Sequence, residues 1–139
     1  MPARYVVGPD GRLVFERWSG SVTLAELRAH KARLVADPSI RAGASILSDA
    51  RGATFPFSPE VAAELAEPEP GLPAERKIAR FALVVDGPMH ASAREFASLV
   101  GQHGMNAIVF NSMEVASAWL GIDARTLQAL VQRVANDAV

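Results

Sequence analysis

Residues 80–110 decide the fold of this chain, and they read RFALVVDGPMHASAREFASLVGQHGMNAIVF. Two runs of strand length, Arg80–Val85 and Ala107–Phe110, lie at its ends. Between them we predict a helix over residues 89–102, because Gly104 follows at a position where glycine commonly ends a helix. This order predicts parallel strands joined by a right-handed crossover, and consecutive apolar positions require cover on both faces of the sheet.

The N-terminal part predicts a β-hairpin and a first helix. Tyr5–Val7 and Leu13–Trp18 flank residues 8–11, Gly-Pro-Asp-Gly, which favour a tight turn. Thr23–Glu26 has the capping-box pattern of a helix start, and that helix ends before Asp37-Pro38. The domain therefore opens with antiparallel strands.

The rest of the chain supplies a strand, a loop and three helices. Ala44–Leu47 is predicted as a short buried strand, whereas Glu16 and Arg17 suggest that the second strand lies nearer an edge. Pro68–Glu75 holds three prolines and a glycine, and is predicted as a surface loop. Each further helix follows a capping residue: Val61–Glu67 after Ser58, Met113–Leu120 after Ser112, and a last helix that begins at Asp123.

Length, charge and cysteine content narrow the function classes. The 139 residues are interpreted as a single domain, 1–139, with the helix over 123–139 appended to it. Lys plus Arg number 14 against 15 Asp plus Glu, so no positive field attracts nucleic acid. Without cysteine there is no disulfide, thiolate nucleophile or cysteine-bound metal. Apolar runs are only strand-sized, so we expect no stable membrane insertion and a cytoplasmic location.

The sequence contains no recognisable catalytic motif. His30, His90 and His103 fall on separate predicted elements without metal-ligand spacing, so neither a metal nor a cofactor is predicted. Nucleotide-binding glycine loops and the nucleophile elbow of hydrolases are missing. An enzyme that uses Asp86 and His90 as an acid/base pair is the weakest of three hypotheses.

The carboxyl ends of parallel strands meet at one rim of the sheet, the usual ligand location in open α/β folds. The candidate residues for a ligand or partner there are Ser19, Asp49, Arg51, Phe55, Phe57, Asp86, His90, Asn111 and Ser112. The polar ones also fit as turn formers or helix caps, and Asp49 with Arg51 as an ion pair that fixes the loop. Phe55 and Phe57 either anchor their loop or line a pocket or interface.

Short motifs in order along roughly residues 4–122 resemble those of a known family. They are the hairpin, Gly20–Thr23, Leu47–Gly52, Ile78-Ala79, Val109-Phe110 and Glu114–Leu120. On these motifs the chain is similar to the SpoIIAA-like group of STAS-type and CRAL-TRIO-like small proteins. The resemblance implies an α/β fold in which an N-terminal β-hairpin leads into a right-handed βα superhelix, with a mainly parallel sheet of about five strands and about five helices.

The best-known STAS proteins are anti-sigma-factor antagonists, switched by phosphorylation of a serine at the start of the helix after the third strand. The matching segment here reads Asp49-Ala50-Arg51-Gly52, and an alanine cannot be phosphorylated. Ser48 and Ser58 remain as candidate phosphorylation sites, with alternative interpretations as a strand-end serine and a helix N-cap.

Two functions follow as predictions. The first is a non-enzymatic regulatory or protein-interaction module of the STAS type, whose partner is another protein. The alternative is a carrier or sensor of a small apolar or amphipathic ligand. The residues that favour this alternative are Phe55, Phe57, Met89 and Phe96, which are expected near one pocket, with Arg51 or Lys31 to bind an anionic head group. Lys31 stands on the apolar stripe of its helix, so it either reaches outward or pairs with a buried acid or anionic ligand.

The last helix carries an apolar stripe that must be buried. Leu127, Leu130, Val131 and Val134 repeat at helical spacing. The stripe either covers its own sheet or meets a second copy in a two-fold homodimer. We expect the dimer, because one short helix covers only part of a sheet face.

Overall fold

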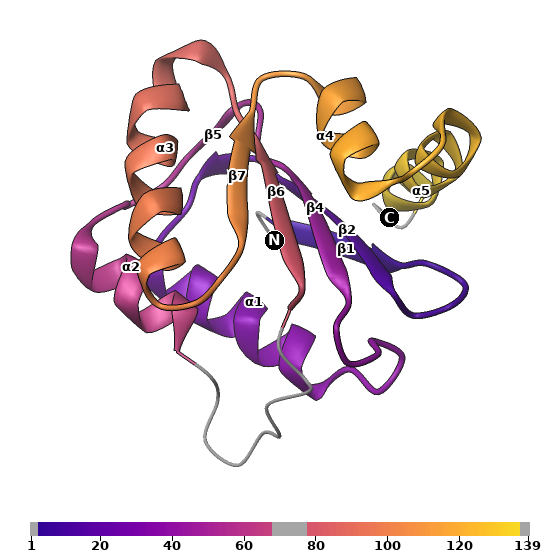
Figure 1. The fold of residues 1–139 in the computed structure, drawn as a ribbon, viewed down its shortest axis with the longest axis horizontal. Coiled ribbons are helices and arrows are strands. Elements are labelled where there is room, and N and C mark those ends of the chain that lie inside the picture. Colours follow the sequence, from indigo (N-terminus) through magenta and orange to yellow (C-terminus); the bar gives the residue numbers. More distant parts are fainter. Residues whose placement is uncertain (1–2, 68–77, 137–139) are drawn as a thin grey trace.

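A five-stranded sheet forms the centre of the computed structural model, which describes residues 3–67 and 78–136 (Figure 1). The strand order is β1-β2-β4-β6-β7. Only β1 runs antiparallel to its neighbour β2, and the other strands are parallel. These strands are β1 (Ala3–Val7), β2 (Leu13–Trp18), β4 (Ser45–Asp49), β6 (Arg80–Val84) and β7 (Ala107–Phe110). The predicted α/β fold, with its N-terminal hairpin and mainly parallel sheet, is confirmed.

In the described part of the chain, five helices cover the two faces of this sheet in separate layers (Figure 1). One layer holds α1 (Leu24–Ala36), α2 (Pro59–Ala66) and α3 (Gly87–Gln102). The opposite layer holds α4 (Met113–Leu120) and α5 (Ala124–Asn136). The consecutive apolar residues of β6 therefore have packing partners on both sides, as predicted. For β7 the prediction is wrong at Ile108, which is 39% exposed, because β7 is an edge strand that the helices cover incompletely.

Local capping signals place most helix boundaries where the sequence predicts them. The Thr23 hydroxyl accepts a hydrogen bond from the Glu26 amide while the Glu26 side chain accepts one from the Thr23 amide. Ser58, Ser112 and Asp123 likewise accept backbone hydrogen bonds in the first turns of α2, α4 and α5. The α3 helix begins slightly earlier than predicted, and the proposed loop over 68–75 lies outside the described residues.

The sequence patterns did not predict a second, two-stranded β-ladder. β3 (Gly20–Ser21) pairs in parallel with β5 (Ala53–Thr54), beyond the ends of the main sheet. Each segment has only two residues, too few to show any alternation of apolar and polar positions. The ladder ties the loop before α1 to the loop that carries Phe55, and so helps position one wall of the site described below.

The turn of the hairpin needs glycine because it packs against the loop before β4. Gly11 has a φ of +75°, and a Cβ built on it would lie 2.5 Å from the Ser39 carbonyl oxygen. The Gly11 oxygen in turn accepts a hydrogen bond from the Arg41 amide at 2.8 Å. Only a residue without a side chain fits this approach, and the predicted tight turn is confirmed.

The apolar stripe of α5 packs on the sheet of its own chain. Leu130 and Val134 are 2% and 1% exposed, in a cluster with Phe15 and Leu47 from the central strands. The Arg133 guanidinium also donates a hydrogen bond to the Val7 carbonyl of the edge strand. The burial of this stripe is therefore explained within one subunit. The expected homodimer stays a prediction, and it no longer needs this helix to supply its interface.

Candidate functional site

A cavity of about 230 Å³ lies between the sheet and helices α1, α2 and α3. This volume is below the range of about 300–1,000 Å³ typical of sites for drug-sized molecules, so it suits a smaller ligand. Its wall is largely apolar and comes from the sheet, from the helix layer of α1, α2 and α3, and from the loops that join them. Representative lining residues are Val14, Trp18, Leu27, Ile46, Phe55, Phe57, Leu65, Phe81, Leu83, Phe96 and Val100.

Aromatic rings form a continuous part of this wall. Trp18 meets Phe55 edge to face with ring centroids 5.4 Å apart, and Phe55 stacks on Phe57 at 5.1 Å. Phe57 then stacks on Phe96 of α3 at 4.3 Å. Such offset and edge-to-face pairs add to the stability gained by burial. Phe55 and Phe57 therefore anchor their loop on the core and also line the cavity, which unites the two interpretations of these residues.

A buried carboxylate interrupts the apolar wall. Glu16 on β2 is only 2% exposed and lines the cavity together with His30 and Ser48. Its Oε2 accepts hydrogen bonds from Trp18 Nε1 at 2.7 Å and Ser48 Oγ at 2.8 Å, and its Oε1 lies 2.9 Å from His30 Nε2. A buried charge is tolerated only with such partners, so these residues act as one polar network.

A chain of contacts leads from this carboxylate toward the outside of α1. The Arg33 guanidinium lies 3.2 Å from His30 Nδ1. A guanidinium can only donate, so Nδ1 accepts and His30 donates to Glu16 from Nε2. The Tyr5 ring packs against the edge of His30, and its hydroxyl donates to Asp37 at 2.7 Å. Burial and that hydrogen bond raise the pKa of Tyr5 to about 12.

The network keeps Glu16 ionised. Burial acts to raise the pKa of this carboxyl, but the facing His30 ring and the hydrogen bonds from Trp18 and Ser48 outweigh burial and hold the pKa below its ordinary value. A general base works best with a pKa near the working pH, and a carboxylate stabilised by three donors is a weak base. The arrangement favours recognition over proton transfer.

The lowered pKa of Glu16 predicts a loss of stability in acid. The ionised carboxylate stabilises the folded state above its ordinary pKa of 4.5, and this contribution disappears as the pH falls through the lower folded value. Urea unfolding from about pH 7 to about pH 3 should therefore show falling stability below about pH 5. Glu16→Gln should flatten part of this slope. An unchanged slope in the variant would contradict the prediction.

Lys31 lines the cavity, but its ammonium serves the end of α2. Nζ donates to the backbone carbonyls of Glu64 at 3.1 Å and Glu67 at 2.5 Å. Cations near a helix C-terminus offset the partial negative charge of the last carbonyls. The side chain thus reaches outward from the core, which is the first of the two alternatives predicted for Lys31. Its assignment as an anion partner for a ligand stays a prediction.

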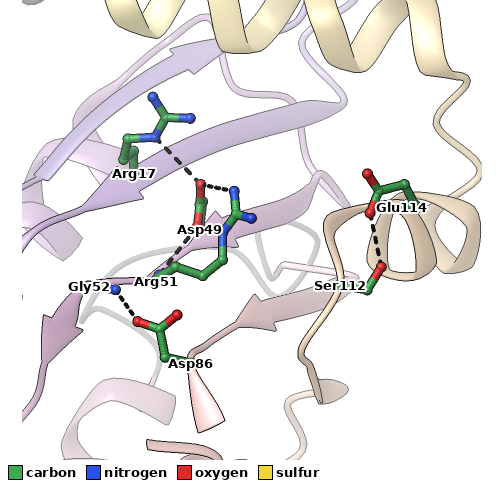
Figure 2. A network of polar contacts seen from close by, with 7 residues as sticks. All are labelled: Arg17, Asp49, Arg51, Gly52, Asp86, Ser112 and Glu114. Carbon is green, nitrogen blue, oxygen red and sulfur yellow. Dashed lines mark hydrogen bonds and ion pairs between the residues drawn. The ribbon is translucent and has the colours of Figure 1, made fainter. Parts of the chain in front are cut away.

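The predicted rim holds an ion-pair network (Figure 2). Asp49 is buried and accepts from Arg51 Nε at 2.9 Å and from Arg51 Nη2 at 3.0 Å, while Arg17 lies 3.5 Å away on the other side. Burial tends to raise the pKa of Asp49, but hydrogen bonds from Arg51 and the charges of both arginines hold it below the ordinary value. The Asp86 carboxylate accepts a hydrogen bond from the Gly52 amide. Asp49 and Arg51 therefore form the ion pair that was predicted as the alternative to a ligand-binding role.

The other rim candidates are distributed around this network rather than gathered at a cavity. Ser112 donates to Glu114 at 3.0 Å as it caps α4 (Figure 2). His90 lies in the first turn of α3, and its Nδ1 is buried without a hydrogen-bond partner in the described part of the chain. Ser19 and Asn111 are exposed. Of the predicted rim set, Phe55 and Phe57 are the ones that line the cavity between the sheet and helices α1, α2 and α3.

The two candidate phosphorylation serines occupy structural positions. Ser48 is fully buried and donates to Glu16, so a kinase would reach it only if the strand left the core. Ser58 is the N-cap of α2, with its hydroxyl accepting from the Val61 amide at 3.1 Å. Phosphorylation of either residue stays a prediction.

Sequence reasoning missed the polar network that distinguishes this cavity. Val14, Glu16 and Trp18 alternate along β2 and share one face, and that pattern could have placed Glu16 beside two buried apolar residues. His30 follows Leu27 by three residues, so it lies on the buried side of α1. Instead, the charge of Glu16 suggested that its strand lies near an edge of the sheet. β2 is indeed next to the edge strand β1.

Comparisons with protein-family models, with curated proteins and with solved structures found no match. The fold and the site by themselves define the class: an α/β protein with a small, largely apolar cavity that the buried Glu16 carboxylate lines. Over residues 3–67 and 78–136, no group of three or more acidic or histidine side chains could hold a metal ion. Within the same ranges, no helix is long and apolar enough to cross a membrane.

Proposed function

We propose that this chain is a non-enzymatic binding protein that holds a small, largely apolar molecule between its sheet and helices α1, α2 and α3. The cavity of about 230 Å³ carries the proposal. Protein interiors are close-packed, and voids much larger than a water molecule are few. A space of this size with an aromatic wall supports a binding site rather than a packing defect.

The polar groups of the cavity support binding over catalysis. Ser48 donates to Glu16, not to His30, so the three residues do not form the nucleophile, base and orienting acid of a hydrolase. Glu16 is held ionised by its partners. At the rim, Asp86 accepts from a backbone amide instead of facing His90 as an acid/base partner.

The regulatory or protein-interaction role implied by the STAS resemblance is the weaker proposal. Within the described ranges, the exposed large hydrophobic residues are Ile108 and Val115. Single exposed apolar side chains are common on protein surfaces and do not define a docking site. The cavity therefore supports ligand binding more directly, while a protein partner and a cytoplasmic location stay predictions.

Ligand binding can be measured through Trp18. The chain has two tryptophans, and Trp119 lies on the opposite side of the sheet, beside Phe110. In the Trp119→Phe variant, tryptophan fluorescence comes from Trp18 alone, which lies in the cavity wall. We expect the fluorescence intensity of Trp18 to change and to saturate on titration with toluene or 1-hexanol. No saturable change with either compound would overturn the proposed function.

A variant that fills the cavity tests the location. Ala97→Leu adds bulk at a lining position of α3 and should weaken toluene binding by about tenfold or more, because it removes space that the ligand needs. Ala91→Leu makes the same change at an exposed position of the same helix and should leave binding unchanged. Equal affinities in the two variants would place the ligand elsewhere.

A further inference from the structure

The buried carboxylate retains an unused capacity to accept a hydrogen bond. Each carboxylate oxygen has two acceptor positions. Glu16 Oε2 uses both, for Trp18 and Ser48, whereas within residues 3–67 and 78–136 Oε1 accepts from His30 alone. One acceptor position therefore remains on a side chain that lines the cavity.

The surroundings of Glu16 determine which ligand group suits that position. The wall is largely apolar, with side chains such as Val14, Leu27 and Ile46. Its lysine, Lys31, donates to backbone carbonyls at the end of α2, and Arg41 is a second cationic residue of the lining. A ligand carboxylate beside Glu16 would place two like charges in an apolar space, which is costly. A ligand hydroxyl would instead donate to the ionised oxygen, and hydrogen bonds to charged groups are among the stronger ones.

On the basis of the proposed function, we infer that the cavity selects a small apolar molecule with one hydroxyl group, an alcohol or phenol, which donates its hydrogen bond to Glu16 Oε1. The aromatic and aliphatic wall accepts the hydrocarbon part, and the carboxylate fixes the orientation of the hydroxyl end. Apolar walls combined with a few well-placed polar groups are the usual basis of small-molecule recognition.

A matched set of ligands separates this selectivity from binding itself. 1-Hexanol, its isomer pentyl methyl ether, and hexanoate would be titrated against the Trp119→Phe protein at neutral pH. The ether has the same atoms as the alcohol but no donor, and hexanoate carries a negative charge. We expect the alcohol to bind about tenfold more tightly than the ether, and hexanoate to bind the most weakly.

The Glu16→Gln variant tests the residue directly. It keeps the shape of the side chain but removes its charge, so the preference for alcohol over ether should fall below about twofold. If that variant does not fold, the ligand series on the Trp119→Phe protein still decides the question. Equal binding of alcohol and ether, or tighter binding of hexanoate, would overturn the inference and leave the proposed function standing. Absence of binding by all three compounds and by toluene would instead count against the proposed function.

Discussion

Leu130→Asp should unfold the domain at room temperature. Leu130 is 2% exposed and packs with residues of β2 and β4. The substitution removes a large apolar side chain, worth about 2–5 kcal/mol, and buries a charge without a partner. The sum is comparable to the whole stability of about 5–15 kcal/mol that small proteins have. Far-UV circular dichroism and light scattering would record the loss of structure.

A charge at an exposed position of the same helix provides the control. Gln128 faces solvent on α5, so Gln128→Asp should lower stability by no more than about 0.5 kcal/mol. A folded, monomeric Leu130→Asp protein derived from a dimeric parent would show that this stripe forms an interface instead. That result would reverse the packing of α5 described above.

Glu16→Ala should produce the second large effect. The substitution leaves three buried donors, from Trp18, His30 and Ser48, without their common acceptor. Removing one partner from a buried charged network typically costs about 3–5 kcal/mol. We therefore expect a clear drop in the midpoint of urea unfolding at neutral pH, measured by circular dichroism.

Ser48→Ala is the matched comparison, because it removes one donor and leaves the carboxylate with its other two. Its expected cost is only about 1 kcal/mol. Equal costs for the two variants would mean that water entering the cavity replaces the Glu16 carboxylate as acceptor. The three donors would then not depend on this residue.

Local sequence signals determined most of the fold. The capping box at Thr23, the N-caps at Ser58 and Ser112, and the glycine that ends α4 all act over a few residues, so their patterns were readable without tertiary information. The apolar run of β6 required cover on both faces, which α3 and α4 supply from opposite layers.

The candidate site was only partly predictable. Phe55 and Phe57 were expected near a pocket because they stand together in a loop at the carboxyl ends of strands. The Asp49 and Arg51 pair was also expected, since two residues of opposite charge two positions apart can meet within one turn. Both inferences needed only neighbours in the chain.

The sequence alone determined the helices, the strands of the main sheet, their order and the need for two covering layers. Only the tertiary structure decided that Glu16, His30 and Ser48 converge. They come from β2, α1 and β4. The register of β2 with β4 and the packing of α1 on the sheet bring them together. A charged residue in a strand could equally face solvent, and its burial depends on which helix covers that face. The cavity has the same origin, because its volume is what the side chains of separate layers leave unfilled.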